Sequence, residues 1–217
     1  MKILIITATE QEMIFFRAKE RSYRGLEFIH AITGVGLLST LHRLLLELNQ
    51  QKPDLVIQMG IAGTFHDEHW IGSATVVKSE SHPEMGVWED NGYSDVFEMG
   101  LLQENAFPYQ QKKLINPHKN LISACLSPEV NAISVNRITT NEADIALYKN
   151  KYGADIESME GAALHYLCIF HAVPFVQIRG ISNLIGDRNK SNWKIKASMD
   201  AAAESCHHLL SSLNTLP

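Results

Sequence analysis

Glu160 is the residue of this chain whose type and position point most directly to chemistry. It lies where a strand-like run, residues 153–158, passes into a helix-like run, residues 159–171. Charged side chains are seldom buried without a task, and the two acceptor oxygens of a carboxylate suit two neighbouring sugar hydroxyls. A glutamate in the first turn of a helix also complements the helix dipole. Taken alone, the position of Glu160 favours this interaction with the helix dipole over a role in binding a ligand.

Two further polar residues occupy positions of the same kind. Glu12 follows the apolar run 2–8, and Asn183 ends the apolar run 174–183. In an open α/β sheet, ligands bind beyond the carboxyl ends of the strands. We therefore expect Glu12, Glu160 and Asn183 to lie on one rim of the sheet, where together they form a candidate site.

The order of apolar patterns along the chain predicts an α/β fold. Strand-like runs cover residues 2–8, 26–33, 54–59, 71–79, 132–138 and 174–181, and helical patterns cover residues 10–21, 36–51, 141–151, 159–171 and 193–213. Strands that alternate with helices are typical of a largely parallel sheet covered by helices. No repeat or linker divides residues 1–217, which predicts a single domain. Segment 82–117 is long and irregular, and such segments are functional where they border a site.

The composition excludes several classes of protein. The chain is 45% hydrophobic and 20% charged, with a formal charge of −5, which is typical of a soluble domain and disfavours nucleic acid as a partner. No apolar run reaches transmembrane length, so we expect no membrane partner, and the N-terminus is expected to be a strand rather than a signal peptide. Three scattered cysteines, Cys125, Cys168 and Cys206, predict buried thiols in a cytoplasmic protein. No spacing of ligands predicts a metal.

Two glycine-containing turns are expected after strands. The first, residues 32–39, partly resembles a dinucleotide-binding fingerprint, but Ser39 replaces its third glycine and no acid follows at the required distance. This disfavours a nicotinamide cofactor. The second, residues 58–64, contains Ile61, Ala62 and Gly63. Its glycines could let backbone amides approach a ribose or an anion, or could permit a tight turn with positive φ.

Five short motifs give the chain a resemblance to a known superfamily. They are Thr-Ala-Thr-Glu-Gln-Glu at residues 7–12, Thr-Gly-Val-Gly at 33–36, Gly-Ile-Ala-Gly at 60–63, Ser-Met-Glu-Gly-Ala-Ala at 158–163 and Arg-Gly-Ile-Ser-Asn at 179–183. In this order they resemble the purine nucleoside phosphorylases and methylthioadenosine/S-adenosylhomocysteine nucleosidases. The resemblance implies a three-layer α/β/α fold with a central mixed, partly barrel-like sheet. It also implies a small-molecule nucleoside substrate, no cofactor, and a homodimer or higher homo-oligomer.

The resemblance assigns roles to the candidate residues. Glu12 matches the carboxylate that activates water in the nucleosidases. Met159 and Glu160 match the pair that packs on the ribose and binds its hydroxyls. In the phosphorylases the turn after the first strand carries a phosphate-binding arginine, whereas residues 7–10 here contain no basic residue. The resemblance therefore implies hydrolysis in preference to phosphorolysis.

The base and the far side of the sugar involve other residues. Asn183 matches the base-recognising residue, which is an aspartate in the adenine-specific nucleosidases. The base-binding loop is expected around Thr139, Thr140 and Asn141. An amide can turn its NH₂ group towards two acceptors, so Asn183 suits a 6-oxopurine such as hypoxanthine.

Within the superfamily, residues 79–102 and 182–193 resemble the futalosine hydrolases of the alternative menaquinone pathway. That resemblance implies release of hypoxanthine from futalosine. Arg188 could bind the aromatic carboxylate of such a substrate through its guanidinium fork, or could lie in a solvated loop. The alternatives are a methylthioadenosine/S-adenosylhomocysteine nucleosidase, a phosphorylase, and a non-catalytic nucleoside-binding protein on the same fold.

Overall fold

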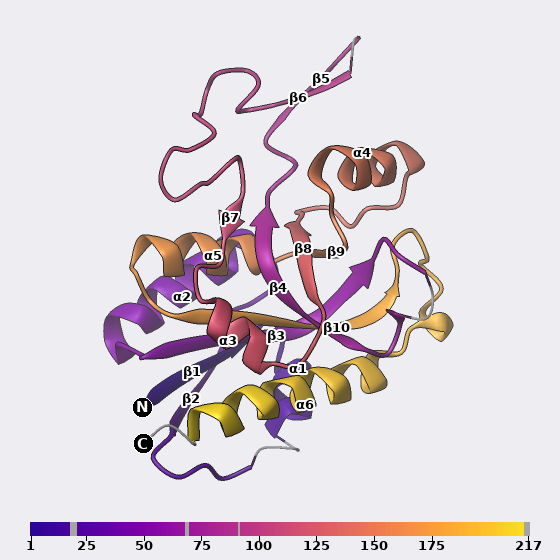
Figure 1. Cartoon of the computed structure of the whole chain (residues 1–217). Coiled ribbons are helices and arrows are strands. Elements are labelled where there is room, and N and C mark those ends of the chain that lie inside the picture. The colour runs from indigo at the N-terminus through magenta and orange to yellow at the C-terminus, as the bar shows by residue number, and fades with distance from the viewer. Residues whose placement is uncertain (18–20, 68–69, 91, 215–217) are drawn as a thin grey trace.

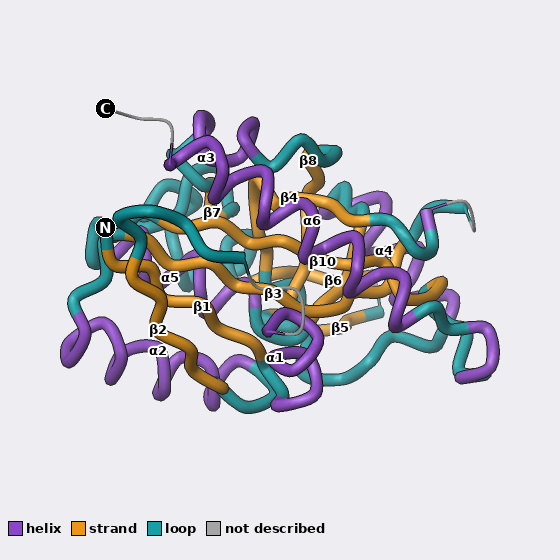
Figure 2. The backbone as a smooth tube through the Cα atoms, turned by 90° about the horizontal axis from the view of Figure 1, so that it is seen from below, coloured by secondary structure: helices purple, strands orange, loops and turns teal. Residues whose placement is uncertain are grey.

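One sheet organises the molecule. The computed structural model describes residues 1–17, 21–67, 70–90 and 92–214 (Figure 1). The strands of this sheet are β1 (Lys2–Thr7), β2 (Glu27–Ile32), β3 (Leu55–Thr64), β4 (Ala74–Ser81), β7 (Leu114–Ile115), β8 (Glu129–Ser134), β9 (Ile156–Ser158) and β10 (Phe175–Leu184). Their order is β10-β4-β8-β9-β3-β1-β2, with β7 paired to β4. β2, β1 and β3 lie side by side (Figure 2).

Part of the sheet closes on itself. β3 pairs with β10 as well as with β9, so that β3, β9, β8, β4 and β10 form a five-stranded ring. The ring is mixed, because β3–β9 and β4–β10 are antiparallel and the other three pairs are parallel. Small and β-branched side chains from all five strands fill one cluster, among them Ala62, Val77, Ala132, Ile156 and Ile181. The predicted mixed, partly barrel-like sheet is confirmed.

Helices cover both faces of the sheet. They are α1 (Glu10–Arg17), α2 (Leu37–Gln51), α3 (Lys119–Ala124), α4 (Glu142–Tyr152), α5 (Gly161–Phe170) and α6 (Ile195–Asn214), with a short 3₁₀ turn, η2 (Lys190–Asn192). α1, α3 and α6 pack into a core with β1, β3 and β10 on one face. α2 and α5 share a second core with the opposite side chains of the same strands, and α5 and α6 lie on opposite sides of the sheet in Figure 1. The three-layer α/β/α arrangement is therefore confirmed.

The expected turn at residues 58–64 is wrong, because β3 continues through Thr64. Neither Gly60 nor Gly63 has a positive φ. Both instead allow neighbouring side chains to approach the β3 backbone closely. A Cβ at Gly60 would lie 2.6 Å from Nη1 of Arg179 and 2.9 Å from Oε1 of Glu12. The glycine therefore makes room for two charged groups that converge over β3.

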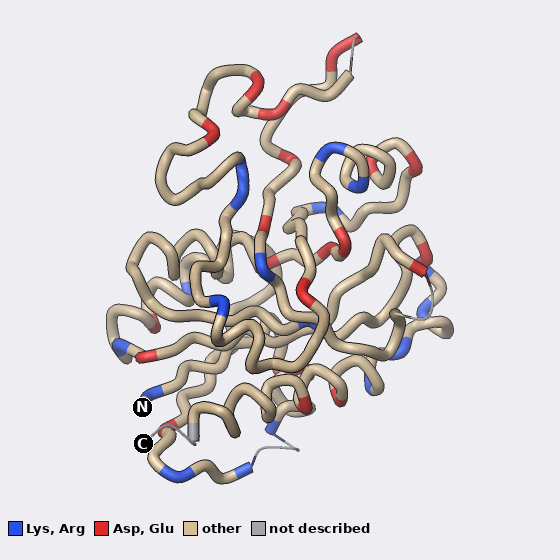
Figure 3. Tube along the Cα trace, viewed as in Figure 1, with Lys and Arg blue, Asp and Glu red and all other residues tan. Residues whose placement is uncertain are grey.

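Other boundaries also differ from the sequence prediction. The strand expected at 132–138 is β8, residues 129–134, and α3 and β7 were not expected. Segment 82–117 contains a hairpin of β5 (Gly86–Glu89) and β6 (Gly92–Asp95). Acidic residues are drawn red in the upper part of Figure 3, where this segment lies. Asp95 and Glu98 of the segment form ion pairs with Lys112 and Lys151. The segment does not line the cavity described below. Within the described ranges, no helix is both long and apolar enough to span a membrane.

Candidate active site

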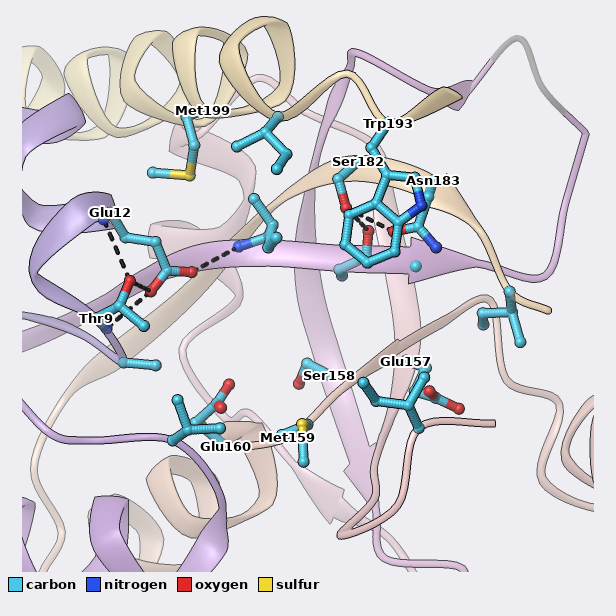
Figure 4. A pocket seen from close by; sticks show the side chains of 18 of the residues that line it. Thr9, Glu12, Glu157, Ser158, Met159, Glu160, Ser182, Asn183, Trp193 and Met199 are labelled. Carbon is cyan, nitrogen blue, oxygen red and sulfur yellow. Dashed lines mark hydrogen bonds between the residues drawn. The ribbon is translucent and has the colours of Figure 1, made fainter. Parts of the chain in front are cut away.

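A cavity of about 340 Å³ brings the three predicted residues together. Glu12 comes from the start of α1, Glu160 from the start of α5, and Asn183 from the end of β10. All three line the cavity, as Figure 4 shows. Other predicted residues that line it are Ile61, Ala62, Gly63, Met159 and Arg188. The rim that the sequence predicted is therefore a real feature of the fold.

Glu12 is held by a capping box at the start of α1. Its backbone N–H donates to the Thr9 hydroxyl at 3.3 Å, and its Oε2 accepts from the Thr9 backbone N–H at 3.0 Å and from the Thr9 hydroxyl at 2.9 Å. Its Oε1 accepts from the Ile61 backbone N–H on β3 at 3.2 Å. Three donors from two elements orient this carboxylate beside the cavity. That is the preorganisation a positioned base requires.

The Glu160 carboxylate is held by an ion pair and a backbone hydrogen bond. Oε2 lies 3.3 Å from Nη1 of Arg179, and Oε1 accepts from the Gly36 backbone N–H at 3.2 Å. Arg179 is 1% exposed, and its Nη2 donates to Oε1 of Gln58 at 2.9 Å. The Gly36 donor depends on the turn after β2, where Gly34 and Gly36 have φ of 83° and 90° and thus need glycine. A buried guanidinium and a backbone amide therefore keep Glu160 aimed at the cavity.

Asn183 lies at the other end of the cavity from Glu12, near Trp193 (Figure 4). Its Oδ1 accepts from the Ser182 hydroxyl at 2.7 Å, and its Nδ2 donates to the Leu184 carbonyl at 2.7 Å. One amide hydrogen remains for a ligand. Arg188 is exposed and lies over the Trp193 ring, 5.3 Å from its centroid, so that both contribute to the mouth of the cavity.

The comparisons with known proteins agree with this geometry. The model of the phosphorylase superfamily matches residues 2–214. The chain belongs to the phosphorylase superfamily. A futalosine hydrolase of Thermus thermophilus is 24% identical, over 95% of this chain and 94% of the relative. A 5′-methylthioadenosine/S-adenosylhomocysteine nucleosidase of Bacillus velezensis is 27% identical, over 86% of this chain and 87% of the relative. The predicted resemblance is confirmed.

Solved structures show the same superfamily fold. A futalosine hydrolase mutant of Helicobacter pylori superposes with a TM-score of 0.81 at 15% identity, over 97% of this chain and 99% of the other. A methylthioadenosine/S-adenosylhomocysteine nucleosidase of Colwellia psychrerythraea, in complex with adenine, gives a TM-score of 0.80 at 18% identity, over 98% and 96% of the two chains. At these identities the likeness establishes the architecture.

The structure places two predicted base-loop residues outside the cavity. Thr140 and Asn141 are both exposed, whereas Thr139, the third residue of the expected loop, lines the cavity together with Ile138. Asn141 is the N-cap of α4, where its side chain accepts from the Asp144 backbone N–H at 2.8 Å. The Asn141 side chain therefore caps α4, whereas the sequence had predicted that it would bind the base.

Sequence reasoning also missed three charged residues that surround the site. Arg179 interrupts the apolar run of β10, and that interruption was the available signal. Glu157 precedes Glu160 by three residues and lines the cavity from β9. Glu80 is fully buried behind the start of α5, where it accepts from Gln177 at 2.9 Å and from Ser134 at 3.1 Å, and burial raises its pKa to about 7.

Proposed function

We propose that this member of the phosphorylase superfamily is an N-glycosidase that hydrolyses futalosine. It would release hypoxanthine and dehypoxanthine futalosine in the alternative menaquinone pathway. The observation that carries the proposal is a single cavity with two oriented carboxylates, Glu12 and Glu160, and an amide, Asn183, at the opposite end. The futalosine hydrolases among the relatives support it.

Hydrolysis needs a water molecule activated beside the sugar. As the C1′–N9 bond breaks, positive charge grows on the sugar and negative charge on the departing purine. We assign Glu12 as the base that takes a proton from this water while the water oxygen bonds to C1′. The purine leaves with the electrons of the broken C1′–N9 bond and takes a proton from solvent. Glu160 would accept hydrogen bonds from the ribose hydroxyls, and Met159 would pack against the ring. Arg179 would keep Glu160 in place and would not contact the sugar.

The charged side chains that line the cavity support water as the nucleophile. Among the described residues that line the cavity, Arg188 is the one with a cationic side chain. It lies against Trp193, at the end of the cavity away from Glu12. Arg179 is close to Glu12 but is buried and already bound to Glu160 and Gln58. A phosphate nucleophile beside Glu12 would therefore meet no unpaired cation among the described residues that line the cavity.

The choice of base rests on Asn183. Hypoxanthine presents acceptors at both N7 and O6, whereas adenine presents an acceptor at N7 beside an amino donor. The remaining amide hydrogen of Asn183 can be donated to N7 or O6, but an aspartate in its place would repel O6 and accept from an adenine amino group. We therefore expect Asn183→Asp to shift the preference towards adenine nucleosides. Unchanged selectivity for hypoxanthine in that variant would refute the assignment.

The futalosine side chain carries a carboxylate, and we propose Arg188 as its partner. The guanidinium lies at the mouth of the cavity, on the ring of Trp193, with its donors in solvent. An exposed guanidinium can bind a carboxylate through two parallel hydrogen bonds. We expect Arg188→Ala to raise the KM for futalosine and to leave cleavage of inosine unchanged. Equal effects on both substrates would contradict this role.

The deciding experiment measures hypoxanthine release from futalosine without phosphate, with methylthioadenosine and inosine as competing substrates. Glu12→Gln is expected to lower kcat by about 10²- to 10⁴-fold, the usual contribution of a positioned base. Glu10→Gln is the matched control, because Glu10 belongs to the same helix, is exposed and does not line this cavity.

Each outcome separates the candidate functions. Phosphate-independent cleavage of futalosine alone supports the proposal. Cleavage of methylthioadenosine instead favours the nucleosidase of that name, whose relatives are as similar to this chain as the futalosine hydrolases are. Binding without cleavage identifies a nucleoside-binding protein.

Two further expectations belong to this proposal. We propose a cytoplasmic location, which the three buried free thiols Cys125, Cys168 and Cys206 support. The homodimer or higher homo-oligomer stays a prediction, and light scattering of the purified protein measures it.

A further inference from the structure

Glu157 and Asn183 flank the same glycine. In the β9–β3 ladder Glu157 is paired with Gly63, and in the β10–β3 ladder Asn183 is paired with Gly63. Residues directly opposite one another on neighbouring strands place their side chains on the same face of a sheet. Glu157 and Asn183 therefore stand on one face, two strand spacings or about 10 Å apart, and the residue paired between them on β3 is a glycine, which has no side chain.

This gap belongs to the cavity. Glu157, Gly63 and Asn183 all line it, and Figure 4 shows the Glu157 and Asn183 side chains on the same part of the cavity wall, away from Glu12. A Cβ at Gly63 would lie 2.9 Å from Ile185 and 3.5 Å from Nδ2 of Asn183, so a larger residue would fill the floor of the gap. The Ile185 side chain borders this floor, and a flat ligand that rests against it would reach both polar side chains.

One oxygen of Glu157 has no partner. Oε1 accepts from the Thr139 backbone N–H at 3.1 Å, whereas Oε2 is buried and makes no hydrogen bond to any described residue. The whole residue is 7% exposed. Buried polar atoms without partners are rare in folded proteins, because losing water without a replacement costs free energy. An unpaired carboxylate oxygen in a cavity wall calls for a ligand that donates a hydrogen bond.

A 6-oxopurine supplies such a donor. In hypoxanthine N1 carries a hydrogen, and it lies next to the O6 acceptor that the Asn183 amide would bind. In adenine N1 is an unprotonated acceptor, which a carboxylate oxygen repels. The Glu157 carboxylate, as an acceptor facing N1, and the Asn183 amide, as a donor facing position 6, therefore distinguish hypoxanthine from adenine at two adjacent ring positions.

We propose that Oε2 of Glu157 accepts a hydrogen bond from N1–H of a 6-oxopurine base, and that Glu157 and Asn183 together select hypoxanthine over adenine. This inference rests on the proposed nucleosidase function and deepens it. Burial also raises the pKa of Glu157, with the carboxylates of Glu84 and Asp144 contributing in the same direction. A hydrogen bond from a bound N1–H group would stabilise the charged carboxylate and so counteract this rise in the pKa of Glu157.

Glu157→Gln is a sharp test, because Thr139 decides how the new amide must turn. The Thr139 N–H needs an acceptor, so the glutamine oxygen takes the place of Oε1 and its NH₂ group takes the place of Oε2. The variant would then present a donor to the N1–H of hypoxanthine and a matching donor to N1 of adenine. We expect hypoxanthine to bind about 10- to 100-fold more weakly and adenine to bind more tightly.

The measurement is isothermal titration of the purified protein with free hypoxanthine and free adenine, which needs no turnover. Glu142→Gln, an exposed position in the first turn of α4, is the control and should leave both dissociation constants unchanged. Glu157→Asp keeps the carboxylate and should retain the preference for hypoxanthine with weaker binding. It also provides the test if Glu157→Gln does not fold.

The results distinguish the inference from the function on which it rests. The quantity compared is the ratio of the dissociation constants for adenine and hypoxanthine. If the wild-type protein prefers hypoxanthine, and this ratio is unchanged in Glu157→Gln or reversed in Glu157→Asp, the role of Glu157 is overturned and the proposed function stands. Tighter binding of adenine by the wild-type protein overturns both. A reversal confined to Glu157→Gln supports both.

Discussion

The ion pair between Arg179 and Glu160 makes a quantitative prediction about stability. Both side chains are buried, at 1% and 7% exposure, and Nη1 and Oε2 are 3.3 Å apart. Arg179→Met removes the cation and leaves the Glu160 carboxylate with the Gly36 N–H as its remaining donor among the described residues. Removing one member of a buried pair costs about 3–5 kcal/mol. For a domain of this size, that corresponds to a fall in Tm of about 6–20 °C.

The assay is urea unfolding of four proteins, the wild type, Arg179→Met, Glu160→Gln and the double variant. Because the double variant leaves no unpaired charge, it should be more stable than the sum of the single changes predicts, by about 1–3 kcal/mol. Arg137→Met is the control. It breaks a pair with Asp144 in which the arginine is 79% exposed, and it should cost at most about 1 kcal/mol. Strict additivity at Arg179 and Glu160 would refute the coupling.

Three further predictions concern the surroundings of the site. Gly161→Ala should strongly destabilise the protein in thermal unfolding, because a Cβ there would lie 1.9 Å from Oε1 of Glu80 and 2.3 Å from Nε2 of Gln177; an unchanged Tm would show that this packing is wrong. Burial raises the pKa of Glu80 to about 7, so the folded state holds a proton that the unfolded state releases above about pH 4.5, and stability is lost as the pH rises between these values. Urea unfolding at pH 5 and pH 7.5 should therefore show Glu80→Gln gaining stability relative to the wild type at the higher pH, and a constant difference would contradict it. Asn141→Ala should cost about 0.5–2 kcal/mol through loss of the α4 cap while kcat/KM is retained, and a loss of nucleoside binding would instead return Asn141 to the site.

Much of the fold followed from local patterns. The alternation of apolar runs located β1, α2, β10 and most other elements to within a few residues, because the side chains of one element share one buried face. The patterns failed where a segment is short or its glycines are ambiguous. β3 was cut short at its glycines, and α3 and β7 were absent from the prediction because two to six residues carry too little periodicity.

The candidate site was predicted in part, for a physical reason. Glu12, Glu160 and Asn183 each stand where an element begins or ends, and the ends of strands in one sheet meet at one edge. Their convergence could therefore be predicted without coordinates. Thr140 and Asn141 were misplaced, because a shift of one or two residues decides whether a loop side chain faces the cavity or caps the next helix.

The sequence by itself determined the α/β class, the rim and the three polar residues on it, since these depend on the order and periodicity of neighbouring residues. Only the tertiary structure decided what surrounds them. The pairing of β3 with both β9 and β10 sets Glu157 and Asn183 on either side of Gly63, and the packing of β10 brings Arg179 to Glu160. Such contacts join segments far apart in the chain. A local pattern shows which face a side chain takes on its own element, whereas its partner is decided when the strands pair and the barrel closes.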